Sequence, residues 1–358
     1  MKKLALIFLA FGVISCHQII EPDLPENIFD KYKGSVVLIV NQYYYEIQSG
    51  QDTYYYSPSS VEKIFMTKEE VIKNLSSSTG TGFIVSNDGE IITNRHVVNP
   101  KDADYRQELY SYVKRTIVTI SNNAEKYNDS IVAIKNYYFE NSNYMDDSQK
   151  QKFEEKYQQL TEGKSYALNA ANFLENVDFS NSTITLVPVD LAIAYDNTFV
   201  TDLQDLQECV VIKESQDEDV DLALIQTKTK TLNKEPSNIL NFKDNNPNLL
   251  ENPEKYQERD IKKPVKVNAD VYMIGFNRGF ALASTKQGIK SQFTVGKVSQ
   301  ENDENRILYT IPTLEGSSGS PIIDKWGNLV AVNFAKITNT QNFSFGIPVY
   351  EVKKFYEN

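Results

Sequence analysis

A short run near the end of the chain, Gly316-Ser317-Ser318-Gly319-Ser320-Pro321, constrains the fold most strongly. Glycines two residues before and directly after Ser318 keep the backbone around it bare, so that a tight turn can present the hydroxyl to a substrate. In such a turn the N–H groups of Gly316 and Ser318 can converge on one developing negative charge. The alternative is an ordinary surface turn, because turns rich in serine and glycine are common. The run predicts a nucleophilic serine beside an oxyanion hole if the chain also supplies a base.

A nucleophilic serine requires a general base, for which histidine is the usual residue, and a carboxylate that orients it. The chain has only two histidines. His17 lies at the end of a leader-like segment, which leaves His96 as the candidate base. Residues 80–98 predict two strands joined by an Asn-Asp-Gly turn, with His96 at the end of the second strand. An incidental histidine at the end of a strand is the alternative.

The candidate carboxylate is Asp221, which stands directly before the apolar run Leu222-Ala223-Leu224-Ile225. Such a run predicts a short strand, and an acid at its start would be held at the rim of a core. Asp217, Glu218 and Asp219 lie just before it, and an acidic run of this kind is usually solvated. We therefore expect Asp221 to orient His96.

The order His96, Asp221, Ser318 is that of chymotrypsin-like proteins, whereas subtilisins and α/β-hydrolases place the same residue types in other orders. Five blocks of the chain, in the same order, resemble the trypsin-like serine proteases of the HtrA (Deg) type. The resemblance implies an all-β fold, a chymotrypsin-like double β-barrel, with His96 and Asp221 on the first barrel and Ser318 on the second. It also implies serine endopeptidase activity. The blocks are Gly80-Thr81-Gly82-Phe83-Ile84-Val85, Thr93-Asn94-Arg95-His96-Val97-Val98, Asp221-Leu222-Ala223-Leu224, Val271-Tyr272-Met273-Ile274-Gly275-Phe276-Asn277 and Phe345-Gly346-Ile347-Pro348-Val349.

The chain also departs from the HtrA pattern. Members of that type usually carry Gly-Asn-Ser-Gly-Gly, and here Ser317 and Ser320 replace the asparagine and the last glycine, which is similar to bacterial glutamyl endopeptidases of the same fold. Asn277-Arg278-Gly279 replaces the usual Asn-Pro-Phe-Gly, so we expect a different loop there. We expect no PDZ domain after residue 358 and hence no regulation by one.

The N-terminus predicts a signal peptide over residues 1–15, with two lysines followed by an apolar stretch too short to span a membrane in the mature protein. Val13-Ile14-Ser15-Cys16 resembles a bacterial lipobox, which implies that Cys16 becomes a lipidated N-terminus. An ordinary signal peptide with a coincidental cysteine is the alternative. We expect residues 16–33 to form a tether and the protein to be a membrane-anchored lipoprotein facing the periplasm or the cell exterior. Cys209 would then be the only remaining thiol, so no intramolecular disulfide is expected.

The composition suits a globular, acidic protein. Of the 358 residues 41% are hydrophobic, enough for packed cores, and the formal net charge is −11. Loss of Lys2 and Lys3 with the leader would make the mature chain more negative, which argues against unspecific binding of nucleic acid. Serine hydrolysis requires no metal or organic cofactor. The sequence does not indicate an oligomeric state.

The expected peptidase domain covers residues 34–358. Its first barrel spans 34–227, a linker 228–263 and the second barrel 264–358. The stretch between His96 and Asp221 is longer than in HtrA relatives, so an insertion is expected at about 100–181. Helical spacing over 101–115 and 147–175 predicts a mostly helical unit with a β-like run at 116–120 between the helices. The insertion is either a lid over the cleft or an outward decoration. We interpret tyrosines 43–45 and 54–56 as strand residues rather than a docking surface.

The register predicts where a substrate would bind. In chymotrypsin-like proteases the floor of the specificity pocket lies six residues before the nucleophile, which here is Pro312, with Thr313 beside it. The opposite wall is the strand with Asn333, Phe334 and Ala335, whose backbone would pair with a protein or peptide substrate. None of these residues is charged, which favours small or medium apolar side chains before the scissile bond. The alternative function is a catalytically silent lipoprotein that uses the protease fold as a binding or chaperone-like module.

Overall fold

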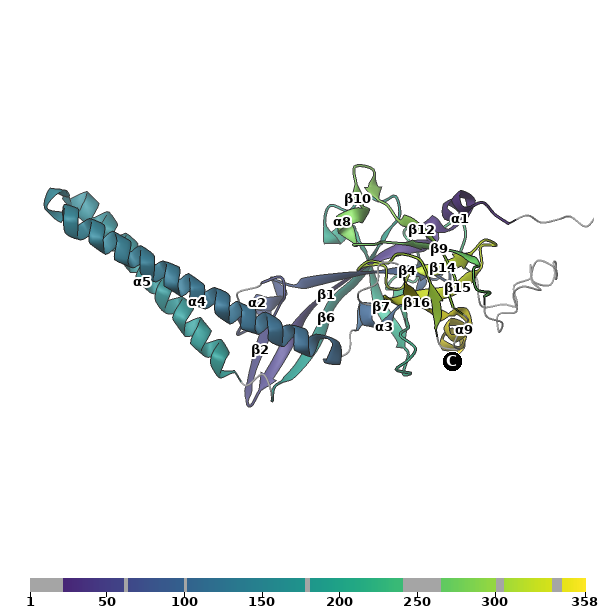
Figure 1. Ribbon diagram of the computed structural model, residues 1–358, viewed down its shortest axis with the longest axis horizontal. Coiled ribbons are helices and arrows are strands. Elements are labelled where there is room, and N and C mark those ends of the chain that lie inside the picture. Colours follow the sequence, from purple (N-terminus) through teal and green to yellow (C-terminus); the bar gives the residue numbers. More distant parts are fainter. Residues whose placement is uncertain are drawn as a thin grey trace, which may run out of the picture.

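The computed structural model describes residues 22–60, 64–99, 102–177, 181–240, 265–300, 306–336 and 343–358. These residues form two β-barrels, and a long helical hairpin projects from the first of them (Figure 1). The predicted fold class, an all-β double barrel with a mostly helical insertion in the first barrel, is confirmed. The signal peptide, Cys16 and most of the predicted linker lie outside the described residues.

The first barrel is closed by six strands in the order β1-β4-β5-β8-β7-β6, because β6 also pairs with β1. Inside it lies an apolar cluster to which β1 contributes Val37 and Ile39, while the alternate residues Leu38 and Val40 point to the second barrel. The strands of this sheet are β1 (Val36–Ser49), β2 (Asp52–Tyr56), β3 (Ile64–Phe65), β4 (Ser76–Ile84), β5 (Glu90–Thr93), β6 (Thr183–Tyr195), β7 (Gln207–Glu214) and β8 (Ala223–Thr227). Short helices on this barrel are η1 (Lys33–Ser35), α2 (Lys68–Ile72), α3 (Arg95–Val98) and η3 (Leu203–Asp205).

The second barrel has six strands in the order β12-β9-β14-β15-β16-β13, and a bridge between Val298 and Tyr309 brings its two edges together. Its interior cluster includes Met273, Tyr309 and Ile322. The strands are β9 (Asp270–Gly275), β12 (Gln292–Lys297), β13 (Ile307–Tyr309), β14 (Pro321–Asp324), β15 (Leu329–Lys336) and β16 (Ser344–Pro348). A helix and a small hairpin follow β9, namely α8 (Phe280–Ala283), β10 (Ser284–Thr285) and β11 (Gly288–Ile289).

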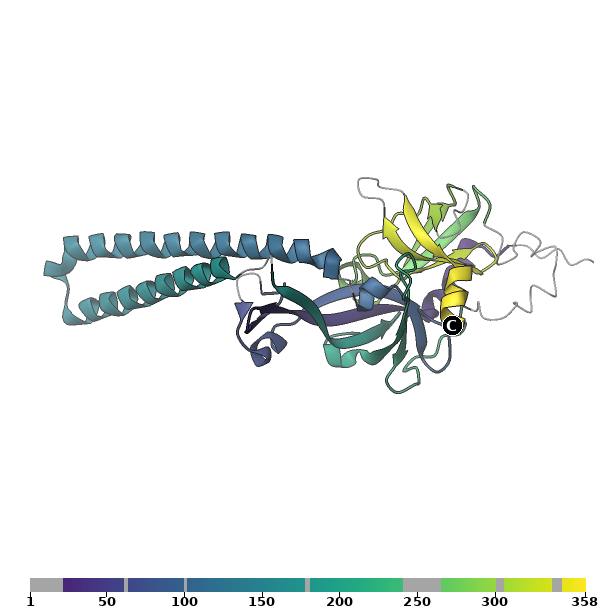
Figure 2. The ribbon, with the colours of Figure 1, turned by 90° about the horizontal axis from the view of Figure 1, so that it is seen from below.

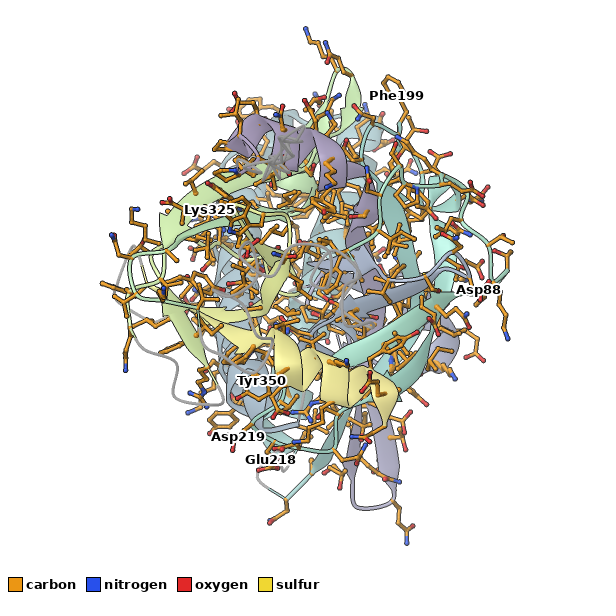
Figure 3. All side chains as sticks on the ribbon, turned by 90° about the vertical axis from the view of Figure 1, so that its right-hand side faces the viewer. Asp88, Phe199, Glu218, Asp219, Lys325 and Tyr350 are labelled. Carbon is orange, nitrogen blue, oxygen red and sulfur yellow. The ribbon has the colours of Figure 1, made fainter. Side chains whose placement is uncertain are left out.

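A third apolar cluster joins the two barrels, and the helices near both ends of the chain contribute residues to it. It contains Leu38 and Phe83 from the first barrel and Val332 and Ile347 from the second. The C-terminal helix α9 (Val349–Glu357) packs on β15 and β16 and crosses to the first barrel, where the Tyr356 hydroxyl lies 2.5 Å from a carboxylate oxygen of Glu90. Figure 3 shows α9 across the end of the molecule that faces away from the helical hairpin.

The expected tether is shorter than predicted, because residues 25–32 form the helix α1 (Pro25–Tyr32). Ile28 and Tyr32, one turn apart, are buried in the cluster between the barrels, and the ring of Phe29 lies 5.4 Å from that of Phe293. The i, i+4 spacing of these apolar residues favours a helix that docks on the domain, which the prolines and acids around them obscured. Residues before α1 remain the predicted tether.

The insertion is a hairpin of two antiparallel helices, α4 (Asp102–Asn141) and α5 (Asp147–Asn176), which we call the arm. A helix of 40 residues is about 60 Å long, and the arm points away from both barrels (Figures 1 and 2). A capping box between Asp146 and Gln149 begins α5 after the short helix η2 (Ser142–Tyr144). Among the outcomes left open for the insertion, this shape favours an outward projection over a lid.

The β-like run predicted at residues 116–120 is wrong, since these residues lie inside α4. Val113, Ile117, Ile120 and Ala124 recur at alternating spacings of four and three residues, which is the pattern of a coiled-coil seam. Ile120 and Ala124 pack in one cluster with Ala167, Ala171 and Leu174 of α5. Burial against α5 therefore overrides the strand preference of the β-branched residues. None of the helices in the described ranges is long and apolar enough to span a membrane.

The base of the arm rests on the tyrosines of β1 and β2. Tyr45 and Tyr56 are buried in one cluster with Val113 of α4, and the Tyr54 ring meets that of Phe173 edge-on at 5.1 Å. The tyrosines therefore have a structural role, as interpreted from the sequence, and the element that they pack against is the arm. From this base β1 runs back to the barrel, where the Asn41 side chain donates 3.1 Å hydrogen bonds to the carbonyls of Val97 and Val98.

Candidate active site

The structure brings His96 and Asp221 together at the edge of the first barrel. His96 lies in α3, directly after β5, and Asp221 lies just before β8, the neighbour of β5. Nδ1 of the imidazole is 2.5 Å from Oδ2 of Asp221, and the other carboxylate oxygen accepts a 3.0 Å hydrogen bond from the backbone N–H of His96. Because a carboxylate accepts, Nδ1 carries the proton and the neutral ring leaves Nε2 free of one. The imidazole is therefore oriented as a base.

Two neighbours of His96 hold the segment that carries Asp221. The Asn94 side chain donates to the Asp221 carbonyl at 2.8 Å, and the Arg95 guanidinium donates to the Ser215 carbonyl at 2.7 Å. Asp217, Glu218 and Asp219 are exposed, as predicted, and Figure 3 shows the last two at the surface. Asp221 is thus the member of the acidic run that the fold fixes against His96.

The environment of Asp221 keeps its carboxyl ionised. Burial raises its pKa, but the hydrogen bonds of His96, the charge of the His96 ring when it is protonated, and the charge of Arg95 outweigh burial and bring the pKa below its ordinary value. At neutral pH the carboxylate is a permanent acceptor for Nδ1–H and can stabilise an imidazolium when one forms.

Ser318 lies between β13 and β14 in a turn of residues 315–320, which we call the Ser318 loop. Gly316 and Gly319 have positive φ angles of 92° and 85°. A Cβ atom on Gly316 would lie 2.5 Å from the Phe276 carbonyl oxygen, and one on Gly319 would lie 2.0 Å from the Thr81 carbonyl oxygen. Both positions therefore require glycine, for conformation and for space.

Thr81 of β4 ties the Ser318 loop to the first barrel. Its N–H donates to the Ser318 carbonyl and its hydroxyl to the Gly316 carbonyl, both at 2.8 Å. The hydroxyl also accepts a 3.0 Å hydrogen bond from the N–H of Phe276. β4 pairs with β5, and β5 leads directly to His96. The contacts of Thr81 therefore hold the Ser318 loop close to the segment that carries His96. No hydrogen bond joins the Ser318 hydroxyl to His96, both of which are described; such bonds are often long before substrate binds.

The four N–H groups of residues 316–319 in the Ser318 loop divide into two pairs. That of Ser317 donates to the Leu314 carbonyl at 3.0 Å and that of Gly319 to the Asn333 carbonyl at 2.8 Å. Within the described part of the chain, those of Gly316 and Ser318 have no acceptor. These two are the donors predicted for the oxyanion hole, and the structure leaves them for a ligand.

A comparison with protein families decides the class of the protein. A family model described as a trypsin-like peptidase domain matches residues 80–332, a range that holds His96, Asp221 and Ser318. The chain belongs to the trypsin-like peptidase family. Among solved structures it is similar to the serine endoprotease from Yersinia pestis, with 13% identity and a TM-score of 0.44 over 94% of this chain and 67% of that chain. No curated protein matches the chain.

The residues predicted to line the specificity pocket of this trypsin-like peptidase come from the segment before the Ser318 loop and from β15. Pro312 is exposed, whereas Thr313 is buried with its hydroxyl 2.7 Å from that of Ser344. Phe334 of β15 is half-buried, and its ring lies 6.4 Å from that of Phe345. Asn333 is buried and hydrogen-bonded to the Ser318 loop. Ala335 belongs to β15, and its side chain lies outside the described part.

Sequence reasoning found the reactive residue types but gave no role to the residues that hold them. Thr81 and Asn94 were part of the HtrA-like blocks, but nothing in the sequence assigned them a role. The two carbonyls that accept the Thr81 hydrogen bonds lie more than 200 positions away in the sequence. In the ranges that the structure covers, no group of three or more His, Cys, Asp or Glu residues could hold a metal ion.

Proposed function

We propose that this trypsin-like peptidase is a serine endopeptidase that cleaves exposed or unfolded protein segments in the bacterial cell envelope. The observation that carries the proposal is the hydrogen bond between His96 Nδ1 and Asp221 Oδ2, because it makes Nε2 the basic nitrogen of the ring. A histidine in that state can take a proton at Nε2 from a neighbouring group. Ser318, held in the loop against β4, is the group that the family match and the triad order support.

In the proposed mechanism His96 Nε2 takes the Ser318 hydroxyl proton as Oγ attacks the scissile carbonyl. Asp221 keeps the ring in place and stabilises the imidazolium. The N–H groups of Gly316 and Ser318 bind the oxyanion of the tetrahedral intermediate. The imidazolium then protonates the leaving amine, and water, activated by the same histidine, hydrolyses the acyl-enzyme. Each step transfers a proton or an acyl group, so the reaction needs no oxidant or reductant.

The HtrA type and the cellular location are parts of the same proposal. The five sequence blocks support an HtrA-like peptidase. The lipobox-like segment supports a lipid on Cys16, and stable anchoring takes more than one acyl chain, as in a bacterial lipoprotein. Mass spectrometry of the native N-terminus checks this; an unmodified terminus beyond Cys16 would contradict it.

The second candidate is a protein that keeps the fold for binding or chaperone-like work without turnover. The length of the arm favours it, because a projection of about 60 Å is more surface than catalysis requires. Hydrolysis of a quenched fluorescent peptide library separates the two. We expect turnover by the native protein and a loss of about 10⁴- to 10⁶-fold in Ser318→Ala and His96→Ala. Cleavage by none of the three proteins would favour the binding function.

A further inference from the structure

Asn333 directs every polar group it has toward the Ser318 loop or its support. It lies in β15 and is 2% exposed. Its backbone N–H donates to the Ser320 carbonyl at 2.9 Å, and its carbonyl accepts from Gly319 N–H at 2.8 Å. A residue expected to pair with substrate through its backbone thus has that backbone engaged within the protein. Its side chain reaches further into the loop.

The Asn333 side chain can lie only one way round. Its Nδ2 donates to the Ser317 carbonyl at 3.0 Å and faces the Ser317 hydroxyl at 3.3 Å. The Ser317 carbonyl is only an acceptor, so the amide nitrogen and not the amide oxygen faces it. Oδ1 then faces the buried hydroxyl of Tyr309 at 2.8 Å. Tyr309 shares its single proton between Oδ1 and the Phe345 carbonyl, 3.0 Å away.

The Ser317 carbonyl belongs to the peptide unit that carries the N–H of Ser318. A peptide unit is planar, and no described residue follows a cis bond, so this carbonyl and this N–H point in opposite directions. A donor that holds the carbonyl therefore turns the N–H to the opposite side of the loop. The Ser318 N–H has no acceptor among the described residues. Two donors on the opposite side set its direction, because the Ser317 carbonyl accepts hydrogen bonds from the Asn333 amide at 3.0 Å and from the backbone N–H of Ser320 at 3.1 Å.

The other oxyanion donor is set by a different element. The N–H of Gly316 shares its peptide unit with the Glu315 carbonyl, which accepts a 2.5 Å hydrogen bond from the backbone N–H of Arg278. One donor is therefore held by backbone from the segment after β9, and the other by the Asn333 side chain of β15 together with the Ser320 N–H. A single substitution at position 333 removes one of the two hydrogen bonds that hold the Ser318 N–H and leaves the support of the Gly316 N–H in place.

We propose that Asn333 is a positioning residue, which holds the Ser317–Ser318 peptide so that the Ser318 N–H faces the oxyanion, and that Tyr309 orients Asn333. The inference rests on the proposed function. It predicts a specific fault: without the amide donor the peptide can rotate, and the transition state loses one hydrogen bond while the ground state of the bound substrate loses little. The effect falls on the rate of the chemical step.

The test is the labelling kinetics of a fluorophosphonate, whose phosphoryl oxygen occupies the oxyanion hole during attack by Ser318. Asn333→Leu has nearly the same shape and no donor. We expect its maximal labelling rate to fall about 10²-fold, as on removal of one oxyanion donor, with the half-saturating probe concentration within about twofold of wild type. Tyr309→Phe keeps the amide donor and should lose less. Ser57→Ala removes a buried hydroxyl that bonds only Ser59 and Ser76, and should label like wild type.

A crystal structure of Asn333→Leu gives a readout independent of activity, with a rotated Ser317–Ser318 peptide as the expected result. An unrotated peptide together with a wild-type labelling rate would overturn the proposal. If Asn333→Leu does not fold, Tyr309→Phe decides: an unchanged labelling rate contradicts the role of the pair. If wild-type protein is not labelled at all, the proposed function fails, and a rotated peptide would still support the structural role of Asn333.

Discussion

The backbone N–H of Thr81 in the first barrel donates a 2.8 Å hydrogen bond to the carbonyl of Ser318 in the second. Together with the Thr81 hydroxyl on the Gly316 carbonyl, this contact spans the boundary between the barrels at Ser318, the proposed nucleophile. In the proposed mechanism the base and the nucleophile come from different barrels. Their relative position therefore depends on contacts of this kind.

Replacing Thr81 by valine tests this dependence. Valine has the shape of threonine, but it leaves the Gly316 carbonyl and the Phe276 N–H without their partner. We expect turnover to fall about 10- to 100-fold and the free energy of unfolding to fall by about 1–3 kcal/mol, the cost of unpaired buried polar groups. Thr81→Ser keeps the hydroxyl and is the matched control. Equal turnover in the valine and serine variants would contradict a role for the hydroxyl.

The depressed pKa of Asp221 makes stability depend on pH in the acid range. A carboxyl whose pKa is lower in the folded than in the unfolded protein stabilises the fold above the unfolded pKa of about 3.9. That contribution is lost as pH falls through the folded pKa. Below about pH 5, wild-type stability should therefore decline more steeply than that of Asp221→Asn, as measured by thermal unfolding at a series of pH values. Parallel declines would argue against the assignment.

The arm should affect protein substrates and not the chemistry itself. It projects away from the barrels, contains no histidine, and is joined to the barrel at its base, next to the strand that contacts Val97 and Val98. We expect a variant with residues 102–176 replaced by a short turn to keep its labelling rate with a small fluorophosphonate and to cleave proteins differently. A folded variant that no longer labels would show that the arm helps to build the active site.

Cleavage should favour small or medium apolar side chains before the scissile bond. Neither Pro312 nor Thr313 is charged, and the Thr313 hydroxyl is already engaged by Ser344. The Arg306 guanidinium lies 5.7 Å from the centre of the Phe334 ring and pairs with Asp219 at 3.7 Å, so its charge has a partner. Profiling with a proteome-derived peptide library measures the preference. Dominant cleavage after Glu, Lys or Arg would contradict it, and Arg306→Gln would then test the origin of a preference for Glu.

The sequence could predict the barrels because most of their strands, apart from β1 and β6, are short, rich in β-branched residues and separated by clear turns. The two strands predicted within residues 80–98, for example, are the end of β4 and the whole of β5, on either side of the Asn-Asp-Gly turn. The candidate residues could be named because the chain has so few histidines, and because Asp221 and Ser318 each stand in a recognisable local setting. These signals are local.

What the sequence could not predict depends on contacts between distant segments. Residues 116–120 favour a strand by composition, and only packing on α5, which begins at residue 147, makes them helical. The apolar face of the helix α1 was not recognised in the sequence, because prolines and acidic residues surround it. The hydrogen bonds of Thr81 and Asn333 reach the Ser318 loop through tertiary folding, which no spacing along the chain records.

The most direct test of the account is the site of covalent modification by a fluorophosphonate, located by peptide mass spectrometry. The account predicts one adduct on Ser318 of the native protein, none after prior unfolding, and none on Ser318→Ala. Labelling should also be lost in His96→Ala, since the hydroxyl is then not activated. A folded native protein that carries no adduct, or carries it on another residue, would contradict the central claim that Ser318 is the nucleophile of a His96–Asp221 pair.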